Sequence, residues 1–296
     1  MNQRGAFLIN GYHLYPGHSH FLSRLGEELK SLGIEMDILK STDVYCQLNE
    51  AGEYVFTSSL NYDFIVVLDK DKYILEALEA KGVRLFNSSY ATSICDDKML
   101  TYMALSRQGI PMPRTISFPL NYARKNHELF FAQLKKNFAF PFVAKTNFGS
   151  MGTGVHLIHN DDELNGLIPD LDEHPYLFQE YIASSSGFDD RLILIGGKFF
   201  CGYRRHGKEG EFRSNISSGG YGEKREIDPA YIALAEEAAQ IIGLDYCGID
   251  ILTGENKQPV LCEVNSNAFF AGAEKVTGQN IAGAYAKYIF QTLYDK

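Results

Sequence analysis

The chain has 296 residues, of which 45% are hydrophobic and 22% are charged, a composition typical of soluble globular proteins with two or three packed units. Its formal net charge of -9 argues against a nucleic acid or an anionic membrane as the main partner, because both attract basic surfaces. Five scattered cysteines without a CxxC pair indicate neither a disulfide framework nor a zinc cluster, and no apolar run is long enough for a membrane span. With no secretory leader pattern at the N-terminus, we expect a cytoplasmic protein.

The first part of the chain predicts alternating strands and helices. Short apolar runs at residues 6–9, 64–68 and 83–86 are typical of buried strands, and helical patterns with apolar residues three to four apart separate them. Gly33 and Gly82 follow the two helical stretches, at positions where helices commonly end. Ser19 is expected to cap the first of these helices. We therefore expect an α/β unit with a small open sheet.

The middle of the chain predicts a helix over residues 97–108 and then a group of strands. A glycine and two prolines end the helix, because proline cannot continue one. Residues 142–145 and 155–158 are expected to form two strands joined by a glycine-rich loop, and residues 177–181 a third strand. A new unit is therefore expected to begin near residue 109.

The last part of the chain predicts two strand pairs and two helices. Residues 191–195 and 199–204 flank Gly196-Gly197, which is a strong hairpin signal. Residues 248–252 and 260–265 are expected to form a second pair. One helix is expected to end near Gly243, and another to cover residues 281–293.

The glycine-rich loop GSMGTG at residues 149–154 is the first segment with a chemical interpretation. Glycines let backbone amides approach phosphate oxygens closely. The loop matches neither GxxxxGK[ST] nor GxGxxG and joins two strands, so a hairpin lid over phosphates and an ordinary turn both remain open. Lys145 precedes the loop and alternates with apolar Val143, so it can project toward a phosphate, although a solvated surface lysine is the alternative.

Oxygen-bearing side chains on two late strands are the strongest single signal. Asp250 lies on one predicted strand, and Glu263 and Asn265 lie two apart on the next, so both point to the same face of the sheet. Burial of carboxylates in such an apolar setting is costly without a cation, and magnesium bound to nucleotide phosphates needs only a few protein oxygens. We favour a metal site over a solvent-facing polar edge.

Two further groups of polar residues have weaker interpretations. A basic cluster precedes a second glycine-rich stretch and could bind phosphate and carboxylate, or could be a solvated loop; its members are Arg204, Arg205, His206, Lys208 and Arg213. His13, His18 and His20 surround Pro16-Gly17, but no cysteine or carboxylate completes a metal site there. Contact of these histidines with substrate stays open.

Six segments, taken in order, resemble the ATP-grasp superfamily and, within it, the RimK-type glutamate ligase branch. They are DDKMLTYMALSRQGIPMPRT (96–115), FPFVAKTNFGSMGTGVHLI (140–158), QEYI (179–182), KEGEFRSNISSGG (208–220), GIDIL (248–252) and EVNSNAFFAGAEKVTGQNIAG (263–283). The resemblance covers most of the chain. It implies an ATP-grasp fold of the α/β class built from α+β two-layer units. An N-terminal pre-ATP-grasp open sheet (1–93) would be followed by a central lid subdomain (94–180) and a C-terminal subdomain with the metal site (181–296).

The resemblance also implies roles for individual residues. ATP would be contacted by Lys98, by Lys145, by the lid residues Gly149, Ser150, Met151 and Gly152, by the adenine-binding segment Gln179, Glu180, Tyr181 and Ile182, by Asp189 at the ribose, and by Arg213 and Asn215. The catalytic anion contacts would be Arg191, Arg204 and Arg213. Two magnesium ions, which manganese could replace, would be held by Asp250, Glu263 and Asn265.

The activity implied is an ATP-dependent ligase that joins a carboxylate to an amine through an acyl phosphate. The carboxylate substrate would be an amino acid such as glutamate, the amine acceptor would be a peptide, a protein or a small molecule, and the protein would form a homo-oligomer. Many family members have Ser-Pro-Gly after the metal-binding Asn, whereas Asn265 is followed here by Ser-Asn-Ala-Phe-Phe, which leaves the amine substrate open. A catalytically silent ATP-binding sensor of the same fold is the alternative.

Overall fold

The N-terminal part of the computed structural model is a four-stranded parallel sheet with the strand order β2-β1-β5-β6. The structure describes residues 4–14, 17–56, 60–150, 152–216 and 219–294. The strands of this sheet are β1 (Arg4–Ile9), β2 (Glu35–Lys40), β5 (Phe64–Val67) and β6 (Arg84–Phe86), and its helices are α1 (His18–Ser31) and α2 (Lys72–Ala80). The prediction of an α/β unit with an open sheet is confirmed.

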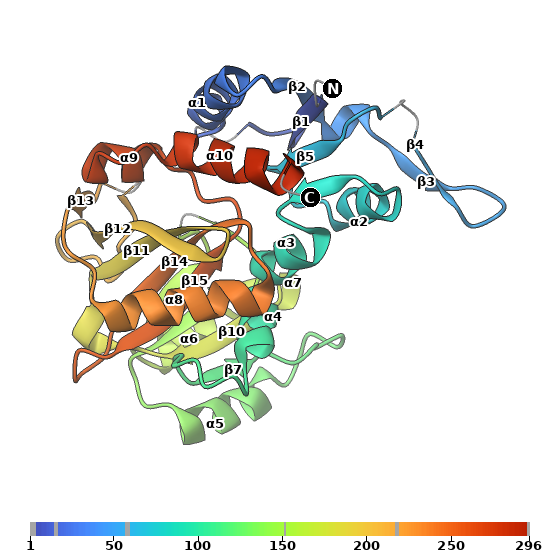
Figure 1. Ribbon diagram of the computed structural model, residues 1–296. Coiled ribbons are helices and arrows are strands. Elements are labelled where there is room, and N and C mark those ends of the chain that lie inside the picture. The colour runs from blue at the N-terminus through green and yellow to red at the C-terminus, as the bar shows by residue number, and fades with distance from the viewer. Residues whose placement is uncertain (1–3, 15–16, 57–59, 151, 217–218, 295–296) are drawn as a thin grey trace.

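Two local features of this unit differ from the sequence-based expectation. Helix α1 begins at His18 after Gly17, with no side-chain cap, so the prediction of Ser19 as the N-cap is wrong. A turn η1 (Ser41–Asp43) and a hairpin of β3 (Cys46–Leu48) and β4 (Tyr54–Phe56) were not predicted, and the hairpin projects from the unit (Figure 1). Its strands have three residues each, too few to give a pattern of alternation.

Two helices lead from this unit to the rest of the chain. They are α3 (Ser89–Asp96), which was not predicted, and α4 (Lys98–Leu105), which ends three residues before the predicted boundary. Asp97 separates them and caps α4, accepting hydrogen bonds from the backbone N–H groups of Met99 at 2.9 Å and Leu100 at 3.2 Å. This cap fixes the start of the helix that carries Lys98.

The second sheet is antiparallel, with the order β7-β10-β8-β9. Its strands are β7 (Thr115–Ser117), β8 (Phe142–Thr146), β9 (Val155–Ile158) and β10 (Tyr176–Glu180), and its helices are α5 (His127–Asn137), α6 (Asp161–Gly166) and α7 (Ile168–Glu173). Phe142 and Phe178 are fully buried in its core. The predicted pairing of the strands on either side of the glycine-rich loop is confirmed.

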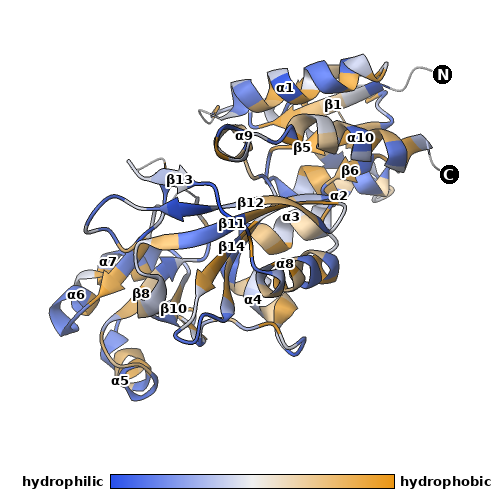
Figure 2. Cartoon of the chain, turned by 60° about the vertical axis from the view of Figure 1, so that its left-hand side comes forward, coloured by the Kyte–Doolittle hydropathy of each residue, from blue (hydrophilic) through white to orange (hydrophobic). Residues whose placement is uncertain are grey.

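The third sheet has five antiparallel strands in the order β13-β12-β11-β14-β15, so both predicted strand pairs are confirmed. The strands are β11 (Phe188–Ile195), β12 (Lys198–His206), β13 (Tyr221–Glu223), β14 (Tyr246–Thr253) and β15 (Pro259–Asn265). A turn η2 (Ala183–Ser185) precedes the sheet, and the helices are α8 (Pro229–Ile242), α9 (Ala271–Thr277) and α10 (Ile281–Tyr294). Figure 2 shows hydrophobic residues concentrated on the strands and on the helix faces that meet them.

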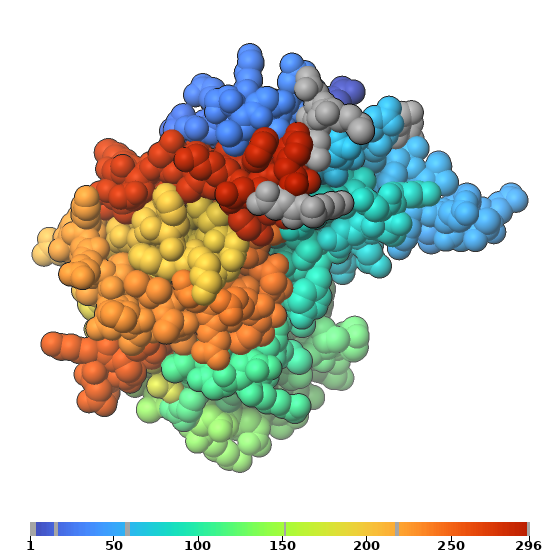
Figure 3. All heavy atoms as spheres, in the orientation of Figure 1, coloured from blue at the N-terminus to red at the C-terminus, as the bar shows by residue number. Residues whose placement is uncertain are grey.

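The end of the chain packs against its beginning. Tyr285 and Ile289 of α10 share one buried cluster with Phe21 and Leu25 of α1 and with Phe64 of β5. The space-filling view accordingly shows the C-terminal helices in contact with the N-terminal unit (Figure 3). This contact holds the N-terminal sheet beside the third sheet and its loops. Within the described ranges, no helix is long and apolar enough to cross a membrane.

Candidate active site

A cavity of about 730 Å³, within the usual size range of small-molecule sites, lies where the three sheets meet. The predicted site residues that line it are Lys98, Lys145, Gly149, Ser150, Gly152, Gln179, Glu180, Tyr181, Ile182, Asp189, Arg191, Arg213, Asn215, Asp250, Glu263 and Asn265. Met151 lies outside the described residues. The fold thus gathers into one space residues that are more than 160 positions apart in the sequence; their individual roles stay predictions.

The glycine-rich loop between β8 and β9 contacts two predicted phosphate-binding segments. Lys98 Nζ donates to the Gly149 carbonyl oxygen at 3.0 Å, and Arg213 Nη1 donates to the Gly152 carbonyl oxygen at 3.1 Å. Gly152 has a φ of +76°, and a Cβ there would lie 2.8 Å from Asn215 Oδ1. Glycine therefore lets the loop adopt this backbone and approach the segment around Arg213 closely.

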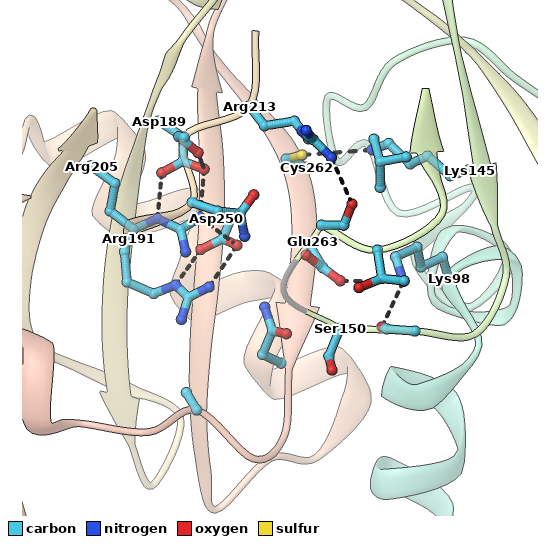
Figure 4. A pocket seen from close by; sticks show the side chains of 18 of the residues that line it. Lys98, Lys145, Ser150, Asp189, Arg191, Arg205, Arg213, Asp250, Cys262 and Glu263 are labelled. Atoms are coloured by element: carbon cyan, nitrogen blue, oxygen red, sulfur yellow. Dashed lines mark hydrogen bonds and ion pairs between the residues drawn. The ribbon is translucent and has the colours of Figure 1, made fainter. Parts of the chain in front are cut away.

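Lys145 projects from the end of β8 toward the third sheet, as Figure 4 shows. Its Nζ lies 3.8 Å from Cys262 Sγ. Burial alone would lower the pKa of Lys145, but its neighbours, Glu263 among them, raise this pKa overall, so the ammonium group is charged at neutral pH. Burial raises the pKa of Cys262 to about 11, so this neighbour is a neutral thiol. Lys145 is therefore a cation without a carboxylate in direct contact among the residues described.

The three oxygen-bearing side chains of the late strands lie on one sheet face. Asp250 and Glu263 are direct partners in the β14–β15 ladder, and Asn265 is two residues beyond Glu263. Glu263 lies 3.5 Å from Lys98 Nζ, and Asn265 Nδ2 is buried with no partner in the part of the chain that the structure describes. All three residues line the cavity, and Figure 4 shows Asp250 and Glu263 on neighbouring strands that form one of its walls.

Two arginines and two aspartates form a buried network beside this wall. Arg205 spans both carboxylates, with Nη2 2.5 Å from Asp189 Oδ2 and 2.8 Å from Asp250 Oδ2. Arg191 Nη2 donates to Asp250 Oδ2 at 2.7 Å. Burial tends to raise the pKa of Asp250, but Arg191 and Arg205 outweigh burial and hold this pKa below its usual range, so the carboxylate is charged.

Arg204 is placed differently from the other predicted site residues. Adjacent residues on a strand face opposite sides, and Arg204 faces away from the cavity: its Nη2 lies 2.8 Å from Asp190 Oδ2, and its guanidinium group packs on the Phe188 ring. The prediction of Arg204 as an anion contact in the site is therefore wrong. Arg205, next to it in the basic cluster, lines the cavity instead. Only the register of β12 against its neighbouring strands shows which of Arg204 and Arg205 faces the cavity.

Asp189 lines the cavity, but its carboxylate is already engaged. Arg205 donates to both of its oxygens, and the Ser214 hydroxyl donates to Oδ2. Burial raises the pKa of Asp189 despite these donors. Asp189 therefore orients Arg205, and its contact with a ribose stays a prediction.

The predicted adenine-binding segment, residues 179–182, begins with the last two residues of β10 and lines the cavity. Gln179 Nε2 donates to Thr115 Oγ1 at 2.8 Å, and the Glu180 backbone N–H donates to the Arg114 carbonyl oxygen at 3.0 Å. The Glu180 side chain accepts a hydrogen bond from Arg114. These contacts tie the segment to β7 and leave the following residues, Tyr181 and Ile182, on the wall of the cavity.

The donor set fits magnesium shared with phosphates. Throughout the described ranges, no group of three or more His, Cys, Asp and Glu side chains could hold a metal by itself. Asp250, Glu263 and Asn265 supply two carboxylates and one amide oxygen, which are hard ligands, and magnesium in nucleotide sites takes its remaining ligands from phosphate and water. Asp250 would have to share its oxygens with Arg191 and Arg205, and Glu263 with Lys98.

Comparisons with known proteins agree with this geometry. Residues 95–289 match the family model described as a RimK-like ATP-grasp domain. A probable alpha-L-glutamate ligase of Marinomonas sp. is 31% identical over 283 residues, which are 92% of this chain and 91% of that protein. Beta-citrylglutamate synthase B of Danio rerio is 32% identical over 228 residues, which are 76% of this chain and 55% of that protein. The chain thus spans about half the length of that second relative.

A solved structure extends the likeness to the whole fold. The ATP-grasp ligase PsnB, complexed with minimal precursor, Mg and ADP, superposes with a TM-score of 0.68 over 97% of this chain and 98% of that chain, at 18% identity. At this identity the likeness shows the fold alone, and it confirms the ATP-grasp architecture expected from the sequence. The family match covers more than half of the chain, and the Marinomonas relative is similar over nearly all of it. This chain therefore belongs to the RimK-like ATP-grasp family, a family of ATP-dependent ligases.

Proposed function

We propose that the protein uses ATP to join a carboxylate to an amine through an acyl phosphate. One observation carries the proposal: a single cavity brings the cations Lys98, Lys145 and Arg213 together with the acidic pair Asp250 and Glu263. The cations suit an anionic triphosphate, and the acidic residues suit the divalent ions that accompany it. The solved relative that contains Mg and ADP supports ATP and magnesium as the nucleotide and metal here.

In the first step, a carboxylate oxygen of one substrate attacks the γ-phosphorus of ATP, and ADP leaves with the electron pair of the broken P–O bond. Lys145 and Lys98 bind the phosphate oxygens, and Arg213 neutralises charge on the transferring group. Arg191 and Arg205 line the cavity, and the parts of their guanidinium groups not engaged by Asp250 and Asp189 would hold the substrate carboxylate. Magnesium, held by Asp250, Glu263 and Asn265, would supply charge neutralisation at the phosphates.

In the second step, the nitrogen lone pair of the amine attacks the acyl carbon, the C–O bond to phosphate breaks, and inorganic phosphate leaves. The ammonium group of the amine must lose one proton before the attack and a second one as the neutral amide forms; the leaving phosphate accepts one of them and water the other. The glycine-rich loop, tied to Lys98 and Arg213, covers the reacting groups and excludes water that would hydrolyse the acyl phosphate. The residues of the chain thus bind and orient the substrates and shield the acyl phosphate from water, and no side-chain nucleophile is required.

Glutamate is the amino acid substrate that the relatives favour. One relative is named a probable alpha-L-glutamate ligase and another a beta-citrylglutamate synthase, so both names contain glutamate. We therefore propose glutamate as a substrate of the present chain. We also propose that the site binds two metal ions and that the protein forms a homo-oligomer. Whether the second substrate is a peptide, a protein or a metabolite depends on the loop after Asn265, where Phe269 lines the cavity.

Phosphate release measured over paired substrates tests this function. We expect the purified protein with ATP and magnesium to release phosphate and ADP only when a carboxylate and an amine, such as L-glutamate, are both present. Mass spectrometry should then find a product heavier than the carboxylate substrate by one glutamate residue. Tight ATP binding without substrate-dependent ADP formation in any pair would contradict the ligase and favour a nucleotide sensor.

A further inference from the structure

Asp69, a buried carboxylate that follows β5 of the N-terminal sheet, lines the cavity. Asp69 follows β5 and is 7% exposed, and Asn10 follows the neighbouring parallel strand β1. Both line the cavity, together with His18. The carboxyl ends of adjacent parallel strands are where open α/β sheets bind ligands. Asp69 is thus placed as a ligand-binding residue, although none of the ATP-grasp segments includes it.

The charge of Asp69 is not balanced by a cation in the described parts of the chain. Its carboxylate accepts a hydrogen bond from the Lys70 backbone N–H at 2.6 Å and long ones from Asn10 Nδ2 at 3.3 and 3.4 Å. The Lys70 ammonium group lies 2.6 Å from Asp96 instead. Burial lowers the pKa of His18, although Asp69 acts to raise it, so this imidazole is mainly neutral at pH 7. A carboxylate buried with neutral donors alone is costly, and a bound cation would offset the cost.

Asp69 also lies close to the loop that follows the predicted metal ligand Asn265. With its side-chain amide turned to donate, Asn267 makes a hydrogen bond of 2.9 Å to the Val67 carbonyl oxygen. Val67 is two residues before Asp69, and Asn267 is two residues after Asn265. The same loop carries Phe269, whose ring would lie 2.6 Å from a Cβ at Gly17. The N-terminal sheet and the metal-side loop therefore form one continuous wall.

The charge of Asp69 restricts what this wall can bind. ATP and the substrate carboxylate are anions, and Asp69 repels both. Apart from magnesium, which is assigned to Asp250, Glu263 and Asn265, the amine substrate is the component that brings a positively charged group: its ammonium is protonated at neutral pH, even in L-glutamate, whose net charge is negative. Resting on the proposed function, we propose that Asp69, assisted by Asn10, holds the ammonium group of the amine substrate and selects amino compounds over analogues without nitrogen.

Equilibrium binding of L-glutamate and of glutarate, which lacks the amine, tests this subsite without requiring turnover. With the nonhydrolysable nucleotide AMP-PNP and magnesium present, the unmodified protein should bind L-glutamate about tenfold or more tighter than glutarate, because an ammonium–carboxylate hydrogen bond is gained. The Asp69→Asn variant should lose that preference while its affinity for AMP-PNP is unchanged. Asp69→Glu should retain part of the preference.

Asp37→Asn is the matched control, because Asp37 lies in the same sheet and forms an exposed ion pair with Arg4. It should behave like the unmodified protein. In turnover assays, Asp69→Asn should raise KM for the amine about tenfold and change kcat little. The subsite would be overturned if the Asp69→Asn variant preferred L-glutamate over glutarate as strongly as the unmodified protein does. It would also be overturned if the unmodified protein bound the two compounds equally well. Absence of ADP formation alongside a preference that depends on Asp69 would overturn the ligase and leave the subsite standing.

Discussion

Replacement of Glu263 by glutamine is expected to lower kcat/KM for ATP by about a hundredfold to a thousandfold, while the protein stays folded. The variant keeps the size of the side chain and removes the charge that faces Asp250 across the β14–β15 ladder and Lys98 at 3.5 Å. Loss of one charged group that stabilises a developing negative phosphoryl centre, here through its metal, commonly costs about two to three orders of magnitude in rate. Phosphate release at saturating magnesium measures the effect.

The matched control for this prediction is Glu255→Gln. Glu255 is exposed in the turn that joins β14 to β15, so it lies on the same hairpin but outside the cavity. It should leave turnover within about twofold, since surface substitutions away from special features change little. Thermal unfolding should show both variants folded. If the Glu263→Gln variant turned over normally at low magnesium, the assignment of Glu263 as a metal ligand would be wrong.

Replacement of Lys145 by methionine is expected to weaken ATP binding by about a hundredfold without a loss of thermal stability. Methionine fills similar space, and the direct contact of the lysine is with the Cys262 thiol at 3.8 Å and not with a carboxylate, so we expect the change in thermal stability to be small beside the loss of binding. A phosphate would be the missing partner of this ammonium group, and charge-assisted hydrogen bonds are among the strongest available. Calorimetric titration with AMP-PNP and magnesium, beside a melting curve, separates the two effects.

Lys135→Met serves as the control for Lys145→Met, because Lys135 is exposed on α5 and pairs with Asp161 on α6. Nucleotide affinity should not change in this control. If Lys145→Met bound the nucleotide normally but unfolded at a much lower temperature, Lys145 would be a structural residue, and the assignment of a phosphate to it would be wrong.

The sequence predicts well those parts of the fold that repeat a local pattern. The five-residue strand β8, its partner β9 and the paired strands β11 and β12 around Gly196-Gly197 carry both apolar runs and turn signals, and the sequence predicts all four strands. The acidic residues of β14 and β15 were also located, because alternation along a strand fixes their common face. By contrast, α3 and the β3–β4 hairpin have few residues and weak periodicity, and neither was predicted.

The errors in the site come from long-range geometry. Arg204 and Arg205 are neighbours in the sequence, and the position of a strand relative to the sheet decides which of them faces the cavity. The basic cluster was visible, but the register of β12 against β11 was not. Asp69 carries no motif at all; it becomes a candidate only when the fold brings the end of β5 beside the loop after Asn265. The burial of Asp69 and the lack of a cation paired with it among the described residues arise only in the folded chain, so the sequence alone does not show them.

The most direct test of the central claim is a crystal structure of the protein soaked with AMP-PNP and manganese, with anomalous scattering used to locate the metal. The account predicts manganese peaks between the triphosphate and the oxygens of Asp250, Glu263 and Asn265, with Lys145 on the phosphates. A triphosphate bound elsewhere in the cavity, or no manganese peak at these three side chains, would contradict it.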